Sequence, residues 1–276
     1  PKAFGTVYEL LETKKHTPDG KFSFWSAINN AITASKLEKY IESLSDKIRA
    51  LITTKELGEK LKDRYGIIVS SNPREDYFKL HNILSSKEGY KRKSFNTTIG
   101  EGCNISKLSS ISEKNVVIGN NVIIEDFVVI RENTIIGDNS IIRAGVILGG
   151  EGFEYKRVDG IIMNVNHCGG VVIGNNVEVQ YNSCIDKALY TWDNTVIGDY
   201  SKLDNLVHIE HGVKIGKRCL IASRSTFGGR TVLGDDSWVG LGATISNGLI
   251  LGKKVSISLG SVVTKNLSDG DKVSGN

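Results

Sequence analysis

The sequence predicts a mainly β protein, a parallel β-helix built from hexapeptide repeats, preceded by a small α/β domain. Two observations carry this prediction: glycine and proline are unevenly distributed, and apolar residues recur at every sixth position. Residues 1–98 hold 5 of the 30 glycines and all 3 prolines, whereas residues 99–276 hold 25 glycines and no proline. Stacked strands use their backbone N–H groups in hydrogen-bond ladders, which proline would break. We therefore divide the chain into two domains, 1–98 and 99–276.

The repeat is clearest between Ile173 and Val263, where fifteen of the sixteen residues at steps of six are apolar and Thr191 is the exception. Shorter registers begin at Ile99 and Ile118. A period of six fits neither a helix nor an alternating strand. It fits short strands with one inward apolar residue each, three of which make an 18-residue coil that stacks on the next. Eleven glycines directly follow an inward residue and are expected at corners, because glycine tolerates unusual backbone conformations and close approach.

Residues 149–172 interrupt the repeat, because the step from Leu148 to Ile173 is 25 residues and not a multiple of six. We expect this segment to leave the coils as a loop. Insertions in solenoids tend to lie on the binding face, which makes the loop a candidate for substrate contacts. An insertion with a purely structural role is the alternative.

The first domain has the pattern of a small α/β unit. Its predicted elements are a helix over 32–44, a strand over 48–52, a helix over 56–64, a strand over 66–69, a turn at 72–73 and a helix over 75–84. A strand end followed by a polar turn and a helix start is a natural edge for ligand binding.

Charge, cysteine content and hydropathy exclude several classes of protein. The net charge of +4 divides into +6 for the first domain and −2 for the second, which is too diffuse for a nucleic-acid footprint. No apolar stretch reaches the ~18 residues of a membrane span, and no signal peptide opens the chain, so we expect a cytoplasmic protein. We expect reduced thiols, not a disulfide framework or a zinc site, for Cys103, Cys168, Cys184 and Cys219.

Several segments together resemble the UDP-3-O-acylglucosamine N-acyltransferases of lipid A synthesis. They are RALITTKELGEKL (49–61), IIVSSNPREDYFKL (67–80), GEGFEY (150–155), VVIGNNVEV (171–179), SCIDKAL (183–189) and DNTVIGDYSKLDNLVHIEHGVKIG (193–216). The resemblance implies a left-handed β-helix, a nucleotide-binding first domain and a homotrimer with sites between subunits. It also implies transfer of an acyl group from a thioester to the amine of a nucleotide-linked amino sugar, UDP or dTDP, without a bound cofactor or metal.

The catalytic residues follow from the same resemblance. The family's catalytic histidine lies in a segment like HIEHGV, which places the general base at His211. An ammonium group must lose a proton before it attacks a thioester, and histidine suits that task near neutral pH. The family's oxyanion donor, a glycine backbone N–H, maps to Gly229, one 18-residue coil beyond His211. Asp204, in the segment KLDN, is predicted to orient the imidazole.

The remaining predicted site residues would contact substrate. In the first domain, an aromatic ring can stack on the pyrimidine base and an amide can read its edge. In the interruption, aromatic rings would line the sugar or nucleotide, and a histidine would lie on the substrate side. The predicted set is Asn72, Tyr77, Phe153, Tyr155, His167 and Asn205. By contrast, His208 flanks the inward Ile209 and is expected to face outward.

Two departures from the family bear on the acyl donor. Gly248 stands where the family has a second histidine, and the family's C-terminal helices do not follow Val263 in this sequence. We therefore expect acyl-CoA and a surface-glycan amino sugar, with a lipid A-type enzyme that uses acyl carrier protein as the alternative. Other possibilities are a non-catalytic β-helix scaffold and a carbonic anhydrase of the hexapeptide type, whose zinc would need three histidines, here His167, His208 and His211.

Overall fold

The computed structural model describes residues 49–275, which form two compact units. The described part of the first unit comprises residues 49–87 together with Tyr155–Val165. The second unit comprises Glu88–Glu154 and the chain from Asn166 onward, and its first coil strand begins at Thr98. The helix predicted over 32–44 lies outside the described residues.

The first unit contains a two-stranded parallel sheet and two helices. Its elements are β1 (Ala50–Thr53), α3 (Lys55–Leu61), β2 (Gly66–Val69) and α4 (Pro73–Ser85). A small apolar cluster holds them together and includes Leu51 from the sheet and Leu57 and Leu61 from α3. The two strands and two helices predicted for this stretch are confirmed, with boundaries shifted by at most a few residues.

An antiparallel hairpin completes the first unit, formed by β12 (Tyr155–Val158) and β13 (Ile161–Asn164). The hairpin turns at Asp159 and Gly160, whose φ values of 49° and 78° lie in the left-handed region that Asp-Gly turns favour. The Asn82 side-chain amide, on α4, donates to the backbone carbonyl of Asn164 at 2.7 Å. The interruption predicted as a loop therefore contains a hairpin, and that hairpin belongs to the first unit.

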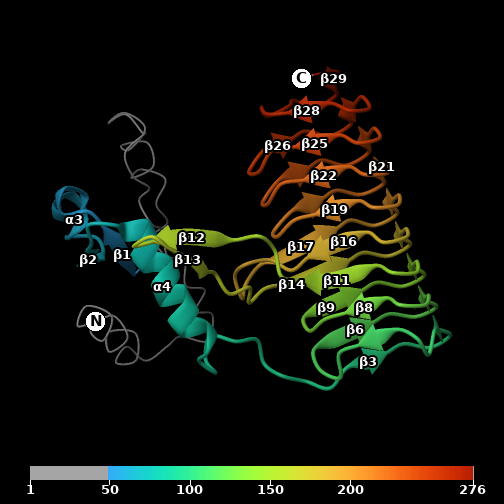
Figure 1. The fold of residues 1–276 in the computed structure, drawn as a ribbon, viewed down its shortest axis with the longest axis horizontal. Helices are drawn as coiled ribbons and strands as arrows, with labels where there is room; N and C mark the ends of the chain where they lie inside the picture. The colour runs from blue at the N-terminus through green and yellow to red at the C-terminus, as the bar shows by residue number, and fades with distance from the viewer. Residues whose placement is uncertain (1–48, 276) are drawn as a thin grey trace. The chain divides into compact units, whose positions relative to one another are not determined.

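The second unit is a left-handed parallel β-helix whose short strands stack into three parallel sheets (Figure 1). The first sheet contains β4 (Asn104–Ile105), β7 (Ile123–Ile124), β10 (Ile141–Ile142), β15 (Glu178–Val179), β18 (Lys202–Leu203), β21 (Leu220–Ile221), β24 (Trp238–Val239), β27 (Ser256–Ile257) and β29 (Lys272–Val273). The second contains β5 (Ser110–Ile111), β8 (Val129–Ile130), β11 (Ile147–Gly150), β16 (Cys184–Asp186), β19 (His208–Ile209), β22 (Thr226–Phe227), β25 (Thr244–Ile245) and β28 (Val262–Val263). The third contains β3 (Thr98–Ile99), β6 (Val116–Ile118), β9 (Thr134–Ile136), β14 (Gly170–Ile173), β17 (Asn194–Ile197), β20 (Lys214–Ile215), β23 (Val232–Leu233) and β26 (Ile250–Leu251).

One inward apolar residue from each hexapeptide builds the core of the prism. Ile209 and Phe227, for example, are fully buried and face each other in paired strands 18 residues apart. Burying such a side chain contributes roughly 1.5–3 kcal/mol, and the same contact recurs in nearly every coil. The predicted repeat and its 18-residue coil are confirmed.

The periodic glycines serve close stacking of the coils rather than unusual backbone angles. A Cβ on Gly198 would lie 2.5 Å from the carbonyl oxygen of Gly216 in the next coil. Neither glycine has a φ in the left-handed region. That region is occupied at many corners by asparagine, as at Asn121 (φ 56°) and Asn139 (φ 57°), which tolerates it better than most residues. The expectation of close approach is confirmed at these glycines, whereas among the eleven periodic glycines only Gly149 has a left-handed φ, of 83°.

The prediction that Thr191 occupies an inward position of a regular 18-residue coil is wrong. Ile173 pairs with Ile197 in adjacent coils, so this coil is 24 residues long and not 18. The extra residues leave the coil after β16, in the segment 187–193. Because the insertion adds one whole period, the apolar residues on either side stay in step and the sequence pattern conceals it.

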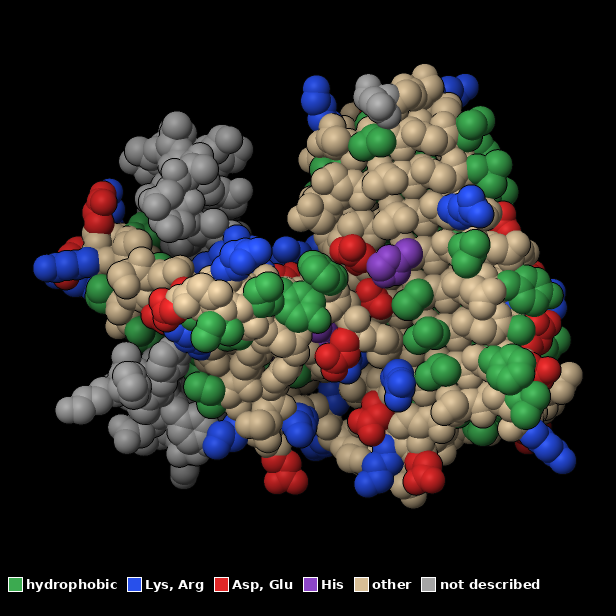
Figure 2. All heavy atoms as spheres, viewed as in Figure 1, with side chains coloured by type: hydrophobic (Ala, Val, Ile, Leu, Met, Phe, Trp, Pro, Cys, Tyr) green, Lys and Arg blue, Asp and Glu red, His purple; other side chains and the backbone are tan. Residues whose placement is uncertain are grey.

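The surface of the coils carries charged side chains of both signs interspersed with apolar and uncharged atoms on the face shown in Figure 2. None of the helices in the described part of the chain combines the length and the apolar character that a membrane crossing requires. All four cysteines are free thiols.

Candidate active site

One corner of the prism, where strands of the second sheet lead into the third, departs from the regular repeat in successive coils. After β11 the chain leaves the coil at Gly150, and after β16 it leaves again at 187–193. In the next two coils, β19 is followed by His211 and β22 by Gly229. Because the coils stack in register, these positions follow one another along the same corner, which we call the active corner.

The imidazole of His211 is held between two glycine backbones. A Cβ on Gly229 would lie 2.6 Å from Nε2 and 2.7 Å from Cε1 of His211. A Cβ on Gly152, at the start of the interruption, would lie 2.9 Å from Nδ1. Side chains at either position would displace the ring, so both residues must be glycine for His211 to occupy this place.

Glu154 is the charged neighbour of His211. Its Oε2 lies 3.3 Å from His211 Nε2, and both side chains are about nine-tenths or more buried. A buried carboxylate beside an imidazole orients the ring and stabilises the imidazolium form when a proton arrives. The sequence analysis did not select Glu154, although it lies within the GEGFEY motif.

His167 packs against His211 in the same buried space. The two ring centroids are 5.5 Å apart and the rings meet edge to face at 76°. Within the described part of the chain, both nitrogens of His167 and Nδ1 of His211 have no hydrogen-bond partner. Burial and the neighbouring His211 lower the pKa of His167 to about 4, so this ring is neutral near pH 7. Unpaired buried nitrogens are costly, which makes these rings candidates for hydrogen bonds to a bound ligand.

The predicted oxyanion donor already has a partner. The backbone N–H of Gly229 donates to Oε2 of Glu210 at 2.8 Å. Glu210 directly precedes His211, so a carboxylate and the catalytic candidate approach Gly229 from the same strand end. The N–H becomes available to a ligand only when the Glu210 side chain moves away.

The predicted role of Asp204 is wrong. Its carboxylate accepts the backbone N–H groups of Asn205 at 2.7 Å and Ser223 at 3.1 Å. Asp204 follows β18 of the first sheet, whereas His211 follows β19 of the second. The seven-residue step from Asp204 to His211 spans more than one side of a coil and places Asp204 at a different corner. Asn205 lies at that corner too, where its side-chain oxygen accepts the N–H of Tyr181.

In the first unit, Asn72 and Tyr77 have structural roles. Asn72 caps α4, accepting the N–H of Glu75 at 3.4 Å and donating to its carboxylate at 2.8 Å. Tyr77 is buried, and its ring packs edge-on against Phe78 at a centroid distance of 5.4 Å. A buried ring offers a nucleotide base little surface on which to stack, so this position argues against the role predicted for Tyr77.

The two aromatic residues of the interruption differ in exposure. Phe153 is 80% exposed and lies between Gly152 and Glu154, which both adjoin His211. Its ring is therefore open to solvent in the segment that carries Gly152 and Glu154. Tyr155 opens β12 and is 45% exposed, within the first unit.

The three histidines of the coils form two separate groups. His167 and His211 pack together, whereas His208 Nε2 lies 3.1 Å from Oδ2 of Asp186. His208 is half-exposed and faces away from the core, as predicted. In the described part of the chain, the three rings do not share one metal-sized group of donor atoms.

Comparison with known proteins agrees with this fold. The bacterial transferase hexapeptide (six repeats) family matches residues 115–150 and 194–229. UDP-3-O-acylglucosamine N-acyltransferase 2 of Legionella pneumophila (strain Lens) is 43% identical over 91 residues, which cover 33% of this chain and 26% of that protein. UDP-3-O-acylglucosamine N-acyltransferase of Delftia acidovorans is 39% identical over 102 residues, covering 37% of this chain and 30% of that protein.

The matched part thus spans less than a third of the length of these relatives. A solved structure, the UDP-N-acetylglucosamine acyltransferase from Campylobacter jejuni, superposes with a TM-score of 0.59 at 26% identity. It covers 66% of this chain and 68% of that one. The chain therefore matches the bacterial transferase hexapeptide model over these two segments, and its coils are similar to those of the UDP-3-O-acylglucosamine N-acyltransferases.

Proposed function

We propose that the protein is an N-acyltransferase that moves an acyl group from a thioester to the amine of a UDP-linked amino sugar. The observation that carries this proposal is the buried imidazole of His211, gripped by Gly152 and Gly229 and paired with Glu154 at the active corner. A base in a dry, closely packed place, beside a backbone N–H, is the equipment that acyl transfer needs.

The relatives are UDP-3-O-acylglucosamine N-acyltransferases, which favours UDP-3-O-acylglucosamine as the acceptor. They support the lipid A-type alternative better than the acyl-CoA reaction on another surface-glycan sugar that the sequence analysis put first. Phe153, whose ring is exposed in the segment that carries Gly152 and Glu154, offers an apolar surface that suits a sugar face or an acyl chain. The donor remains an acyl thioester, carried by acyl carrier protein or by CoA.

The chemical step uses His211 twice. As the amine nitrogen attacks the thioester carbonyl carbon, His211 takes the proton that the nitrogen loses, and the carbonyl electrons move onto oxygen. The tetrahedral intermediate then collapses, the C–S bond breaks, and the leaving sulfur takes the proton from the imidazolium. Glu154 stabilises that imidazolium between the two transfers. The products are an amide and a free thiol.

The oxyanion of the intermediate would be bound by the N–H of Gly229. In the free chain this N–H is bonded to Glu210, so the donor binding step includes displacement of that carboxylate. The oxygen of the tetrahedral intermediate carries more negative charge than the carbonyl oxygen of the bound substrate. A hydrogen bond from the Gly229 N–H therefore stabilises the intermediate more than the substrate.

We extend the proposal to a homotrimer that acts in the cytoplasm, with its sites between neighbouring subunits. The resemblance to the acyltransferase family supports this assembly. Sedimentation of the purified protein measures it: a species with three times the chain mass is expected, and a monomer at working concentrations would contradict it.

The experiment that tests the proposed function is a matrix of donors and acceptors. Acyl-CoA and acyl carrier protein thioesters of short and long chains are each combined with UDP- and dTDP-amino sugars, including UDP-3-O-acylglucosamine. We expect amide formation with a UDP-linked acceptor, detected by mass, and thiol release in equal amount. Acylation of a hydroxyl, or no transfer from any donor, would contradict the proposal. A non-catalytic scaffold would bind a sugar nucleotide without releasing thiol.

A further inference from the structure

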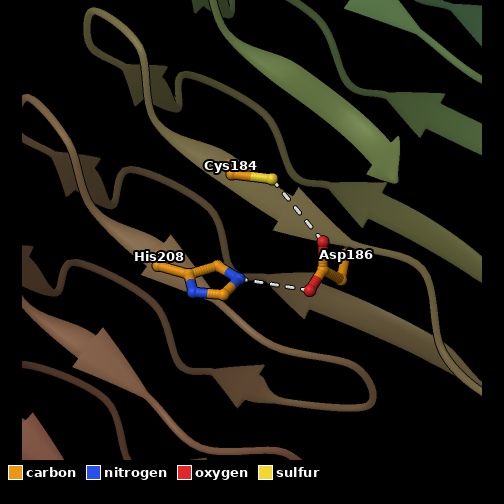
Figure 3. A group of neighbouring side chains, drawn as sticks. All are labelled: Cys184, Asp186 and His208. Carbon is orange, nitrogen blue, oxygen red and sulfur yellow. Dashed lines mark hydrogen bonds and ion pairs between the residues drawn. The ribbon is translucent and has the colours of Figure 1, made fainter. Parts of the chain in front are cut away.

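A second group of polar side chains lies on the outer side of the second sheet. Cys184 and His208 are directly opposite each other in the paired strands β16 and β19. Asp186 ends β16, and its carboxylate lies between them, with Oδ1 3.5 Å from Cys184 Sγ and Oδ2 3.1 Å from His208 Nε2 (Figure 3). The three donor atoms all lie within 4.8 Å of one another.

We propose that Cys184, Asp186 and His208 form a site for a borderline-soft divalent cation of the Zn²⁺ class, with the fourth position open to water. Thiolate, carboxylate and imidazole are the ligands that zinc takes from proteins, usually in a tetrahedral arrangement. A site with three protein ligands and one open position is typical of zinc that remains accessible to small molecules.

The spacing of the donor atoms suits this cation. In a tetrahedral site with metal–ligand distances of about 2.0–2.3 Å, the donor atoms are roughly 3.3–3.8 Å apart. The Asp186 carboxylate lies 3.5 Å from Cys184 Sγ through Oδ1 and 3.1 Å from His208 Nε2 through Oδ2, and the three donor atoms all lie within 4.8 Å of one another. Rotation of these side chains would bring the sulfur, the ring nitrogen and one carboxylate oxygen to this spacing around an ion.

The local structure holds these ligands in place. The pairing of β11 with β16 shifts register between Leu148 and Gly150, which sets Gly150 opposite Asp186. The Asp186 side chain is 7% exposed, whereas that of His208 is 41% exposed and leaves a path from solvent. The site is therefore rigid at its buried carboxylate and accessible at its imidazole.

The chemistry of the thiol favours a metal ligand over a nucleophile. A negative group lies beside the thiol, because Oδ1 of Asp186 is 3.5 Å from Cys184 Sγ. A nucleophilic cysteine needs the opposite environment, with a positive group that stabilises the thiolate. A bound dication supplies that positive charge, and the thiol releases its proton when the S–metal bond forms.

The test uses Co²⁺ as a spectroscopic probe on the full chain after treatment with a chelator. We expect one Co²⁺ per chain, a thiolate-to-cobalt charge-transfer band, and displacement of Co²⁺ by Zn²⁺. Cys184→Ser should abolish the band and weaken binding by at least about tenfold, because even residues outside the first coordination sphere contribute that much. His208→Ala should weaken binding by at least as much.

Cys103→Ser is the matched control, since Cys103 is another half-buried thiol of the coils that lies outside this group. It should leave the band and the affinity unchanged, and so should His211→Ala. A band that survives Cys184→Ser, or no cobalt binding by a folded chain with excess Co²⁺, would overturn the proposal. Metal binding is measured without substrate, so its failure is distinguishable from a failure of the proposed acyl transfer.

Discussion

The active corner and the other two corners of the prism are built from the same repeat, but their polar groups differ. At the corner between the third and first sheets, charged residues form an exposed ladder, as where Arg218 bonds to Asp236 one coil on at 2.6 Å with side chains 52% and 36% exposed. Such pairs contribute little to stability because water screens them. At the active corner, Glu154 and His211 form a pair whose side chains are 10% and 6% exposed.

This difference shows where a repeat fold places its reactive side chains. In the regular coils, buried hydroxyl groups such as those of Ser201 and Ser225 donate to backbone carbonyl groups of the next coil. Where 150–169 and 187–193 leave the coil, neighbouring coils acquire space for buried histidines and a carboxylate. Function here follows from interruptions of the repeat, placed on a frame that the repeat keeps rigid.

Among these tests of the contrast between the active corner and the regular corners, Gly229→Ala is expected to lower the acyl transfer rate most. The added methyl group would overlap the His211 ring, whose Nε2 lies 2.6 Å from that position. A displacement of about 1 Å in a catalytic group can cost roughly a hundredfold in rate, and we expect a loss of that order. Gly89→Ala is the control, because a Cβ there meets nothing within 4 Å. Equal acyl transfer rates in both variants would contradict the tight packing around His211.

Glu154→Gln should have the next largest effect. A hydrogen bond to a charged group contributes about 1.5–3 kcal/mol, which corresponds to roughly a tenfold to hundredfold loss of kcat. Because Glu154 acts through His211, we expect KM to change little, and Glu154→Asp should recover part of the rate. A rise in KM at constant kcat would show instead that Glu154 binds substrate.

The buried state of His167 predicts a pH dependence of stability. Its pKa is about 4 in the folded chain, against an ordinary value of 6.5, so the unfolded chain binds the proton more readily. The contribution of the neutral ring is complete above about pH 6.5 and is lost as the pH falls toward 4. Urea unfolding across this range should show His167→Gln losing less stability than the parent chain. Identical pH profiles would place His167 in water and not beside His211.

The smallest effect concerns the first unit, where Asn72 caps α4. Asn72→Ala should lower stability by about 0.5–2 kcal/mol, the usual cost of losing such a cap. Asn72→Asp, which preserves a cap, is the matched variant and should recover most of that loss. If Asn72 also reads a nucleotide base, KM for the UDP-sugar would rise in both variants, and the purely structural role argued here would be wrong.

The sequence was sufficient to predict the coils, because each hexapeptide must bury one apolar residue and the period has no other regular explanation. It also placed Gly229 one coil beyond His211, since both lie in uninterrupted repeats. It failed at 187–193, where an insertion of one period leaves the pattern intact. Asp204 failed because a spacing along the chain says little about proximity once a corner has been turned.

Side-chain groups whose members come from distant segments could not be predicted from the spacing of residues in the sequence. Glu154 and Gly152 reach His211 from an interruption whose path no periodicity describes. The Cys184, Asp186 and His208 group depends on the pairing of β16 with β19, which the insertion after β16 displaces from the expected 18-residue step to 24. The GEGFEY motif and the break in the repeat were the sequence signals that pointed to Gly152 and Glu154. No sequence signal pointed to the group of Cys184, Asp186 and His208.

The most direct test of the central claim compares the acyl transfer rate of His211→Ala with that of Val213→Ala. Both side chains are buried in the same coil, so both variants loosen it, but only the first removes the proposed base. The account predicts that His211→Ala loses at least ~10²-fold in turnover while Val213→Ala keeps most of its activity, with both variants folded. A folded His211→Ala protein with the parent rate would contradict the assignment of this corner as the active site.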